Sequence, residues 1–230
     1  MGEEHANREY KDRLFNALFG REEHKNWTLD LYNAVSGKNY KDKNLIELNT
    51  IEGVVYMGMH NDVSFIIDCT VNIYEQQSTF NPNMPLRILM YLGKLYDKYV
   101  TSRKKNIYGS RQIQLPVPKL VTFYNGTREE PDEKILSLSD AFPKGSDPDV
   151  QVRVRMLNIN YGRNKELMEK CRPLMEYAWL VREIRSNKEK GMDLDTAISM
   201  AIRKMDDDSL IKDFLLENES EVKDMLKKMH

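Results

Sequence analysis

The sequence predicts a mixed α/β fold that is followed by a run of helices. Two short segments, 61–67 and 71–77, are rich in β-branched and aromatic residues and flank a turn-prone Asp68-Cys69-Thr70, which predicts a β-hairpin. From Asn164 onward the chain instead shows helical periods rich in Met, Lys and Glu. Strands and helices mixed in the first part of the chain, followed by helices alone, favour an α/β core with a helical extension at the C-terminal end.

The N-terminal part predicts two helices and further strands before the hairpin. Residues 7–19 form a helical pattern in which Leu14, Phe15, Leu18 and Phe19 make an apolar stripe. A second helix is expected at 22–35, and strands are expected at 44–50 and 53–59.

After the hairpin, the segment 81–85 breaks the chain and starts a helix. Asn83 is expected to cap this helix, and Pro85 is tolerated in its first turn. Strands are then expected at 119–124, after two prolines, and at 151–159, where polar and apolar residues alternate.

Helical patterns occupy the rest of the chain, and the predicted division is a domain at 1–160 and a helical extension at 161–230. The extension comprises helical patterns at 166–185, 193–204 and 209–229. The last of these is amphipathic, so it serves either as a lid on the core or as a dimerisation surface.

The amino-acid composition limits the classes of protein to which the chain can belong. The 230 residues are 40% hydrophobic and 31% charged, which predicts a soluble globular chain with one sizeable core. A net charge of −1 argues against a nucleic-acid surface over the whole chain, so any DNA contact is expected to be local. Two cysteines without metal-ligand spacing, no signal-peptide pattern and no membrane-length apolar run predict a cytoplasmic location.

The hairpin carries the most chemical information. With a turn centred on Cys69, Asp62 falls opposite Gln76 or within one residue of it, at the roughly 5 Å that separates opposed side chains, so Asp62 and Glu75 become neighbours. Facing carboxylates repel each other unless they are solvated, one is protonated, or a divalent cation lies between them. Val71, Ile73, Glu75 and Gln77 share one strand face, which begins apolar and ends polar. This is the pattern of a core strand that ends in a site, although two solvated strand-end acids remain the alternative.

An acid, then Glu-x-Gln on the next strand, then an Arg on the following helix resembles the PD-(D/E)XK nuclease superfamily. Specifically, the chain resembles the bacterial Rpn-type recombination-promoting nucleases, which are also described as transposase-like. The resembling blocks cover nearly the whole chain: 7–15, 31–37, 61–65, 74–87, 123–127, 138–142 and 157–160.

The resemblance implies a central mixed sheet flanked by helices and a metal-dependent active site. Asp62 and Glu75 would bind Mg²⁺ or Mn²⁺, the backbone carbonyl of Gln76 would be a further ligand, and Gln77 would position the attacking water. The sequence departs from the superfamily pattern at Asn61, which replaces Pro, and at Gln77, which replaces Lys. An amide can orient water but cannot supply the positive charge of Lys.

Further site residues are expected on two helices. Superfamily members often supply an acid from the first helix, and Asp12 is the choice here, with Glu9 as the alternative. On the helix after the hairpin, Arg87 and Tyr91 are expected near the acids, with Arg87 binding phosphate. Lys94 and Lys98 continue this polar stripe and are expected to be solvated.

Arg103, Lys104 and Lys105 form a dense basic patch directly after the same helix. The patch either contacts nucleic-acid phosphates or complements the dipole of the helix end.

The functional prediction is a metal-dependent DNA endonuclease linked to DNA recombination or mobile elements. The alternative is a DNA-binding or partner-binding protein that retains the nuclease fold but turns over little, because Gln77 replaces Lys. One active site per chain would favour a homodimer for cutting both strands. A third interpretation is an oligomeric scaffold that assembles through the C-terminal helices.

Overall fold

A computed structural model describes residues 13–48 and 63–226 of the chain. Its centre is a six-stranded mixed sheet in the order β1-β2-β3-β4-β6-β5. Strands β1 (Ile46–Leu48), β2 (Val63–Ile67) and β3 (Thr70–Gln77) are antiparallel neighbours. The sheet then continues with β4 (Val117–Tyr124) and β6 (Arg153–Asn158), which both run parallel to β3, and ends with the antiparallel edge strand β5 (Glu133–Ser137).

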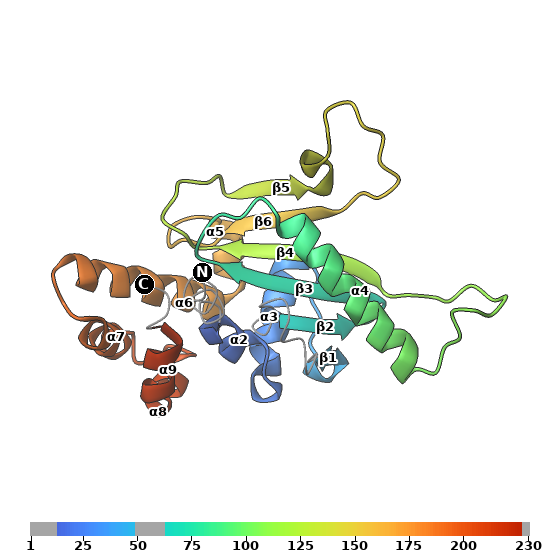
Figure 1. The fold of residues 1–230 in the computed structure, drawn as a ribbon. Helices are drawn as coiled ribbons and strands as arrows, with labels where there is room; N and C mark the ends of the chain where they lie inside the picture. The colour runs from blue at the N-terminus through green and yellow to red at the C-terminus, as the bar shows by residue number, and fades with distance from the viewer. Residues whose placement is uncertain (1–12, 49–62, 227–230) are drawn as a thin grey trace.

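Helices cover both faces of this sheet, so the predicted α/β class is confirmed (Figure 1). One face packs against α4 (Met84–Ser102). The opposite face packs against α2 (Arg13–Phe19), α3 (Lys25–Ser36) and α6 (Arg172–Glu189). The remaining helices are α5 (Lys165–Lys170), α7 (Leu194–Arg203), α8 (Lys212–Glu217) and α9 (Glu219–Leu226).

The hairpin lies where the sequence predicts it, with a register one residue from the one that a turn centred on Cys69 would set. Val63 pairs with Tyr74 and Ile67 with Thr70, so the turn contains Asp68 and Cys69. Asp68 adopts a φ of 53°, a left-handed conformation that Asp tolerates better than most residues. Alternation along β3 places Val71 and Ile73 against α4 and Tyr74 in the core on the other face.

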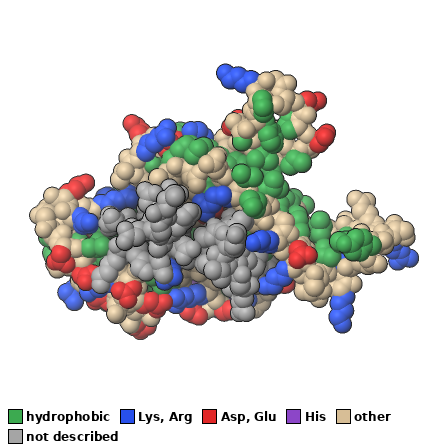
Figure 2. Space-filling model, in the orientation of Figure 1, with side chains coloured by type: hydrophobic (Ala, Val, Ile, Leu, Met, Phe, Trp, Pro, Cys, Tyr) green, Lys and Arg blue, Asp and Glu red, His purple; other side chains and the backbone are tan. Residues whose placement is uncertain are grey.

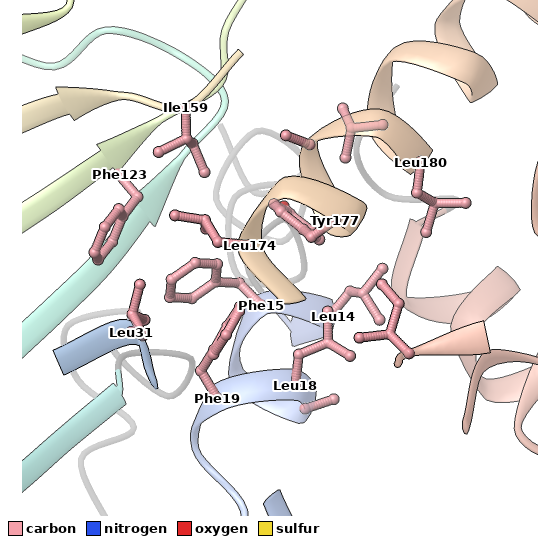
Figure 3. Close-up of a cluster of buried hydrophobic side chains, with 14 of the residues drawn as sticks. Leu14, Phe15, Leu18, Phe19, Leu31, Phe123, Ile159, Leu174, Tyr177 and Leu180 are labelled. Carbon is pink, nitrogen blue, oxygen red and sulfur yellow. The ribbon is translucent and has the colours of Figure 1, made fainter. Parts of the chain in front are cut away.

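The larger hydrophobic cluster joins the sheet to the N- and C-terminal helices. Figure 3 shows Phe15 of α2 between Phe123 of β4 and Tyr177 of α6. The same cluster includes Ile198 of α7, Leu215 of α8 and Val222 of α9. The predicted helical extension is therefore packed into the core of the sheet domain rather than held apart from it.

Several elements differ from their sequence-based prediction. The predicted helix at 166–185 is divided at Cys171, because Pro173 cannot continue a helix but fits the first turn of α6. The last amphipathic segment forms two helices, α8 and α9. Edge strand β5 was not predicted from the sequence, since Glu133 and Ile135 are exposed and only Leu136 of this five-residue strand is buried. The expected strand at 53–59 lies outside the described residues.

Two segments project from the body in Figure 1: the connection from α4 to β4 and the connection from β5 to β6. On the face shown in Figure 2, acidic and basic side chains are interspersed, which agrees with the near-zero net charge. No helix within the described ranges is long and apolar enough to cross a membrane.

Candidate functional site

The polar end of β3 is buried beneath the N-terminal end of α4. Glu75 is 1% exposed and Gln77 is 6% exposed, although both side chains are strongly polar. They follow Val71 and Ile73 on the strand face that α4 covers. The sequence-based interpretation of β3 as a core strand that becomes polar at its end is consistent with this burial.

Arg87 of α4 forms an ion pair with Glu75. Its Nη2 lies 2.7 Å from Oε1 of Glu75, and the Arg87 side chain remains about one-third exposed (32%). The helix begins so that Arg87 lies one turn from its start, and Arg87 N–H donates to the carbonyl of Asn83. Asn83 is the N-cap residue as predicted, but its side chain makes no capping hydrogen bond. Asn81 instead accepts from the Asn83 N–H.

The carboxylate of Glu75 is electrostatically unusual. Burial raises its pKa from 4.5 to about 7, while the guanidinium of Arg87 acts in the opposite direction. Burial has the larger effect because desolvation disfavours the charged form of a carboxyl group, and a partly exposed Arg87 compensates for only part of that cost. Glu75 therefore changes protonation state near neutral pH.

Three oxygens on this face of the sheet lack a hydrogen-bond partner among the described residues. They are Oε2 of Glu75, Oε1 of Gln77 and Oγ1 of Thr122. Thr122 is the residue of β4 directly paired with Glu75. Unsatisfied buried oxygens are costly, so several on one face indicate a place for a cation or a hydrogen-bond donor.

This donor set fits part of a magnesium site. Carboxylate, amide and hydroxyl oxygens are hard ligands of the kind that Mg²⁺ and Mn²⁺ prefer. The carbonyl of Gln77 accepts from Asn125 N–H on the β4 side at 2.9 Å. By strand alternation the carbonyl of Gln76 faces the β2 side, as a metal ligand near the hairpin would require. Within 13–48 and 63–226, however, no group of three or more His, Cys, Asp or Glu side chains could hold a metal ion.

Two predicted site residues lie outside the described part of the chain. These are Asp62, which precedes Val63 of β2, and Asp12, which precedes Arg13 of α2; the alternative Glu9 lies outside it as well. Their predicted roles stay predictions.

Other predicted residues are placed by the structure. The Gln76 side chain lies on the opposite face from Glu75 and donates to Oδ1 of Asn125 at 2.5 Å. Nε2 of Gln77 donates to the sulfur of Met84, so Oε1 of Gln77 takes no part in that contact. Tyr91 is 3% exposed and its hydroxyl lies 3.2 Å from that of Ser64. Tyr91 is therefore a core residue rather than part of the exposed polar stripe that the sequence predicts.

The basic patch is separated from Glu75 by the length of α4. Arg87 is in the first turn, whereas Arg103 follows the last residue, Ser102, so the two are roughly 24 Å apart at about 1.5 Å per residue. Arg103 pairs with Glu47 at 3.1 Å and lies over the ring of Tyr99. Lys104 is exposed with a φ of 52°, and Lys105 donates to the carbonyl of Gln114. The structure does not bring this patch to Glu75.

The sequence analysis missed Thr122 and Asn125. Thr122 is a hydroxyl residue among the apolar residues of β4, and that break in an otherwise apolar run was the available signal. Asn125 is fully buried and contacts Gln76 and Tyr177 through its side chain. No local pattern could identify this role of Asn125, because Gln76 and Tyr177 come from distant parts of the chain.

Comparison of the chain with protein-family models, curated proteins and solved structures found no match in any of the three. The geometry of β3, β4 and α4 and the resemblance of the sequence blocks are therefore what a functional proposal depends on.

Proposed function

We propose that this protein is a metal-dependent DNA endonuclease of the PD-(D/E)XK type, related to the Rpn-type recombination-promoting nucleases. The observation that carries the proposal is the buried Glu75 carboxylate, one oxygen of which has no hydrogen-bond partner among residues 13–48 and 63–226, as is also true of the Gln77 side-chain oxygen on the same strand face. A solvated strand-end acid, which was the alternative, is incompatible with 1% exposure. The mixed sheet flanked by helices supports the proposal at the level of architecture.

In this proposal Glu75 and Asp62 are the acidic metal ligands, and Asp12 is a further acid near them. Mg²⁺, when bound, would lower the pKa of a water molecule and neutralise charge that develops on the phosphate. The carbonyl of Gln76 contributes an additional oxygen ligand. Because metal binding requires the ionised carboxylate, Glu75 must lose its proton, and a pKa of about 7 allows this near neutral pH.

Gln77 and Arg87 act on the water and the phosphate in this proposal. Nε2 of Gln77 donates to Met84, and Oε1 of Gln77, which no described residue contacts by a hydrogen bond, can accept one from the attacking water and orient it. Arg87 is partly exposed at the N-terminal end of α4, where its guanidinium can contact a phosphate oxygen while it remains near Glu75. The proposal gives no role to Tyr91, which is buried.

The second candidate is a DNA-binding or partner-binding protein with little turnover. The Arg87–Glu75 ion pair favours it, because Arg87 occupies one oxygen of the carboxylate that a metal would need. Gln77 supports it as well, since an amide provides no positive charge near the phosphate. The two candidates differ in whether DNA is cut, not in whether it is bound.

The experiment is cleavage of supercoiled plasmid with Mg²⁺, with Mn²⁺ and with EDTA. The variants are Asp62→Ala and Glu75→Gln, and the matched control is Glu183→Gln. Glu183 is also a buried glutamate in an ion pair, with Lys204 at 2.5 Å, but it belongs to the contact of α6 with α7. Nicking that requires metal, is lost in both site variants and persists in the control supports the nuclease. Absence of nicking by the folded wild-type protein in both metals favours the binding protein.

A further inference from the structure

A pocket with polar and charged residues at its border lies at the carboxyl ends of β4 and β6, on the other side of the sheet from Glu75. It has a volume of about 240 Å³ and is bordered by Asn125, Asn160, Tyr161, Arg182, Arg185 and Glu189, among others. Asn125 follows the last residue of β4, and Asn160 follows β6 by two residues. The carboxyl ends of parallel strands are the usual position of ligand sites in α/β sheets.

Arg185 is the most informative residue of this pocket. Its guanidinium donates to the carbonyl of Asn125 at 2.5 Å and to Oδ1 of Asn160 at 3.2 Å. Both partners are neutral, and no carboxylate of residues 13–48 or 63–226 pairs with it. Burial lowers the pKa of Arg185 from its usual value. A half-buried cation without a counter-ion is energetically costly, and an anion in the pocket would remove that cost.

Arg182 brings a second positive charge to the same pocket. It lies one turn before Arg185 on α6, so both side chains project from one face of the helix. Its guanidinium carbon is 4.1 Å from the centroid of the Tyr161 ring, and its contact with Glu183 is long, at 3.8 Å. The aromatic ring orients the guanidinium while leaving its donors available.

The charge and the volume of the pocket are suited to a phosphate group. Two guanidinium groups offer paired N–H donors that match the oxygens of a phosphate group. Drug-sized ligands occupy cavities of roughly 300–1,000 Å³, so about 240 Å³ suits a single phosphate with part of a nucleoside. The carboxylate of Glu189, which is exposed at the border of the pocket, would repel a larger anion that extended past the two arginines.

Asn125 connects this pocket to the Glu75 side of the sheet. Its carbonyl accepts from Arg185, its Oδ1 accepts from Gln76, and its N–H donates to the carbonyl of Gln77. Gln76 and Gln77 directly follow Glu75 on β3. The pocket and Glu75 therefore lie near the same end of the parallel strands, on opposite faces of the sheet.

We propose that Arg182 and Arg185 bind a phosphate group of the nucleic-acid strand at a position away from the cleaved bond. This inference rests on the proposed function for the identity of the strand. The phosphate site itself depends only on the pocket and its arginines.

The test is equilibrium binding of a short, fluorescently labelled single-stranded oligonucleotide in EDTA, where cleavage does not interfere. The variants are Arg182→Ala, Arg185→Gln and Glu189→Gln, with Arg203→Ala as the matched control. Arg203 is an exposed arginine of α7 whose ion pair among the described residues is a long one, 3.9 Å, to Glu219. Its replacement by Ala changes the net charge by the same amount as Arg182→Ala. Thermal unfolding of each variant confirms folding, and Arg182→Ala is the decisive one because its side chain is about half exposed.

Loss of a charge-assisted contact is expected to weaken binding about tenfold in Arg182→Ala and at least as much in Arg185→Gln. Glu189→Gln should tighten binding, and Arg203→Ala should stay within about twofold, since Arg203 does not line the pocket and an exposed charge is screened by salt. Binding of both pocket variants within twofold of wild type overturns the inference. Competition by inorganic phosphate at the same molar concentration as the oligonucleotide would show a free-phosphate site and also overturn it.

The two proposals fail separately in this design. Plasmid cleavage without any effect of Arg182→Ala on binding overturns the phosphate pocket and leaves the nuclease intact. Weakened binding in Arg182→Ala, together with no cleavage by wild type in Mg²⁺ or Mn²⁺, supports the pocket and overturns the nuclease.

Discussion

Arg87 Nη2 lies 2.7 Å from Oε1 of Glu75, and yet the pKa of Glu75 is raised rather than lowered. The pair joins a fully buried strand residue to a partly exposed helix residue, so the desolvation of the acid outweighs the attraction of the base. This imbalance makes the stability of the folded protein depend on pH, and it would do the same for the affinity of the proposed metal site.

Glu75→Gln is expected to stabilise the metal-free protein at alkaline pH. The pKa of Glu75 is about 7 in the folded protein and 4.5 as its ordinary value, so its stabilising contribution is complete below pH 4.5 and is lost as pH rises through 7. Gln does not titrate, so the variant does not lose this contribution. The free energy of unfolding of the variant minus that of wild type should therefore increase by up to about 3 kcal/mol between pH 5 and pH 8. Urea unfolding at both pH values measures this difference, and a difference that does not change with pH would contradict the raised pKa.

Arg87→Ala is expected to destabilise the protein at pH 8 by about 1–2 kcal/mol, and much less at pH 5. At pH 8 the ionised Glu75 loses its counter-ion, whereas at pH 5 the carboxyl group is already protonated. The matched control is Arg103→Ala, which removes an exposed pair with Glu47 and should change stability by less than about 0.5 kcal/mol at either pH. If both variants lost the same free energy of unfolding at pH 8, the Arg87–Glu75 ion pair would contribute no more to stability than an exposed ion pair does.

Mg²⁺ is expected to stabilise the wild-type protein more at pH 8 than at pH 6, because the cation competes with the proton on Glu75. The melting temperature, measured with and without Mg²⁺ at both pH values, reports this linkage. Glu75→Gln should lose the effect, and Glu183→Gln should keep it. A Mg²⁺ effect of the same size in Glu75→Gln would place the ion elsewhere.

Gly126→Ala is expected to destabilise the fold by about 1–3 kcal/mol. A Cβ at Gly126 would lie 2.5 Å from the carbonyl oxygen of Ser78 and 2.5 Å from the hydroxyl of Tyr124, and a backbone oxygen cannot easily move away. Gly93→Ala is the matched control: it lies in the middle of α4 with nothing within 4 Å of the added carbon. That substitution should stabilise the protein by roughly 0.5–1 kcal/mol, because alanine favours helix. In thermal unfolding, the melting temperature should fall for Gly126→Ala and rise for Gly93→Ala.

Val222→Ala in α9 is expected to destabilise the whole protein by about 1–2 kcal/mol. Val222 is completely buried in the cluster that contains Phe15 of α2 and Phe123 of β4. Denaturant unfolding should remain one transition that shifts as a unit. A separate early transition, with the main one unchanged, would show that the C-terminal helices fold independently, as the scaffold interpretation requires. Truncation after Gly191 is expected to leave an unfolded or aggregated chain for the same reason.

Local patterns in the sequence determined the positions of most described elements. The hairpin followed from two β-branched segments around Asp68-Cys69, and α4 followed from Pro85 and the chain break before it. Alternation along β3 was sufficient to put Glu75 and Gln77 on one face, because the side-chain period of a strand is two. Glu133 to Ser137 carried no comparable pattern, since Leu136 is the one buried residue of that short edge strand.

The tertiary structure decided the environment of these residues. The burial of Glu75, its ion pair with Arg87 and its neighbour Thr122 arise from packing between α4, β3 and β4, which no local pattern contains. The separation of Arg103 from Arg87 follows from the straight length of α4, and the pocket around Arg185 follows from the parallel pairing of β4 with β6. Charge, burial and distance are properties of chain segments brought together, so the sequence determined which groups are present and the fold determined what they can do.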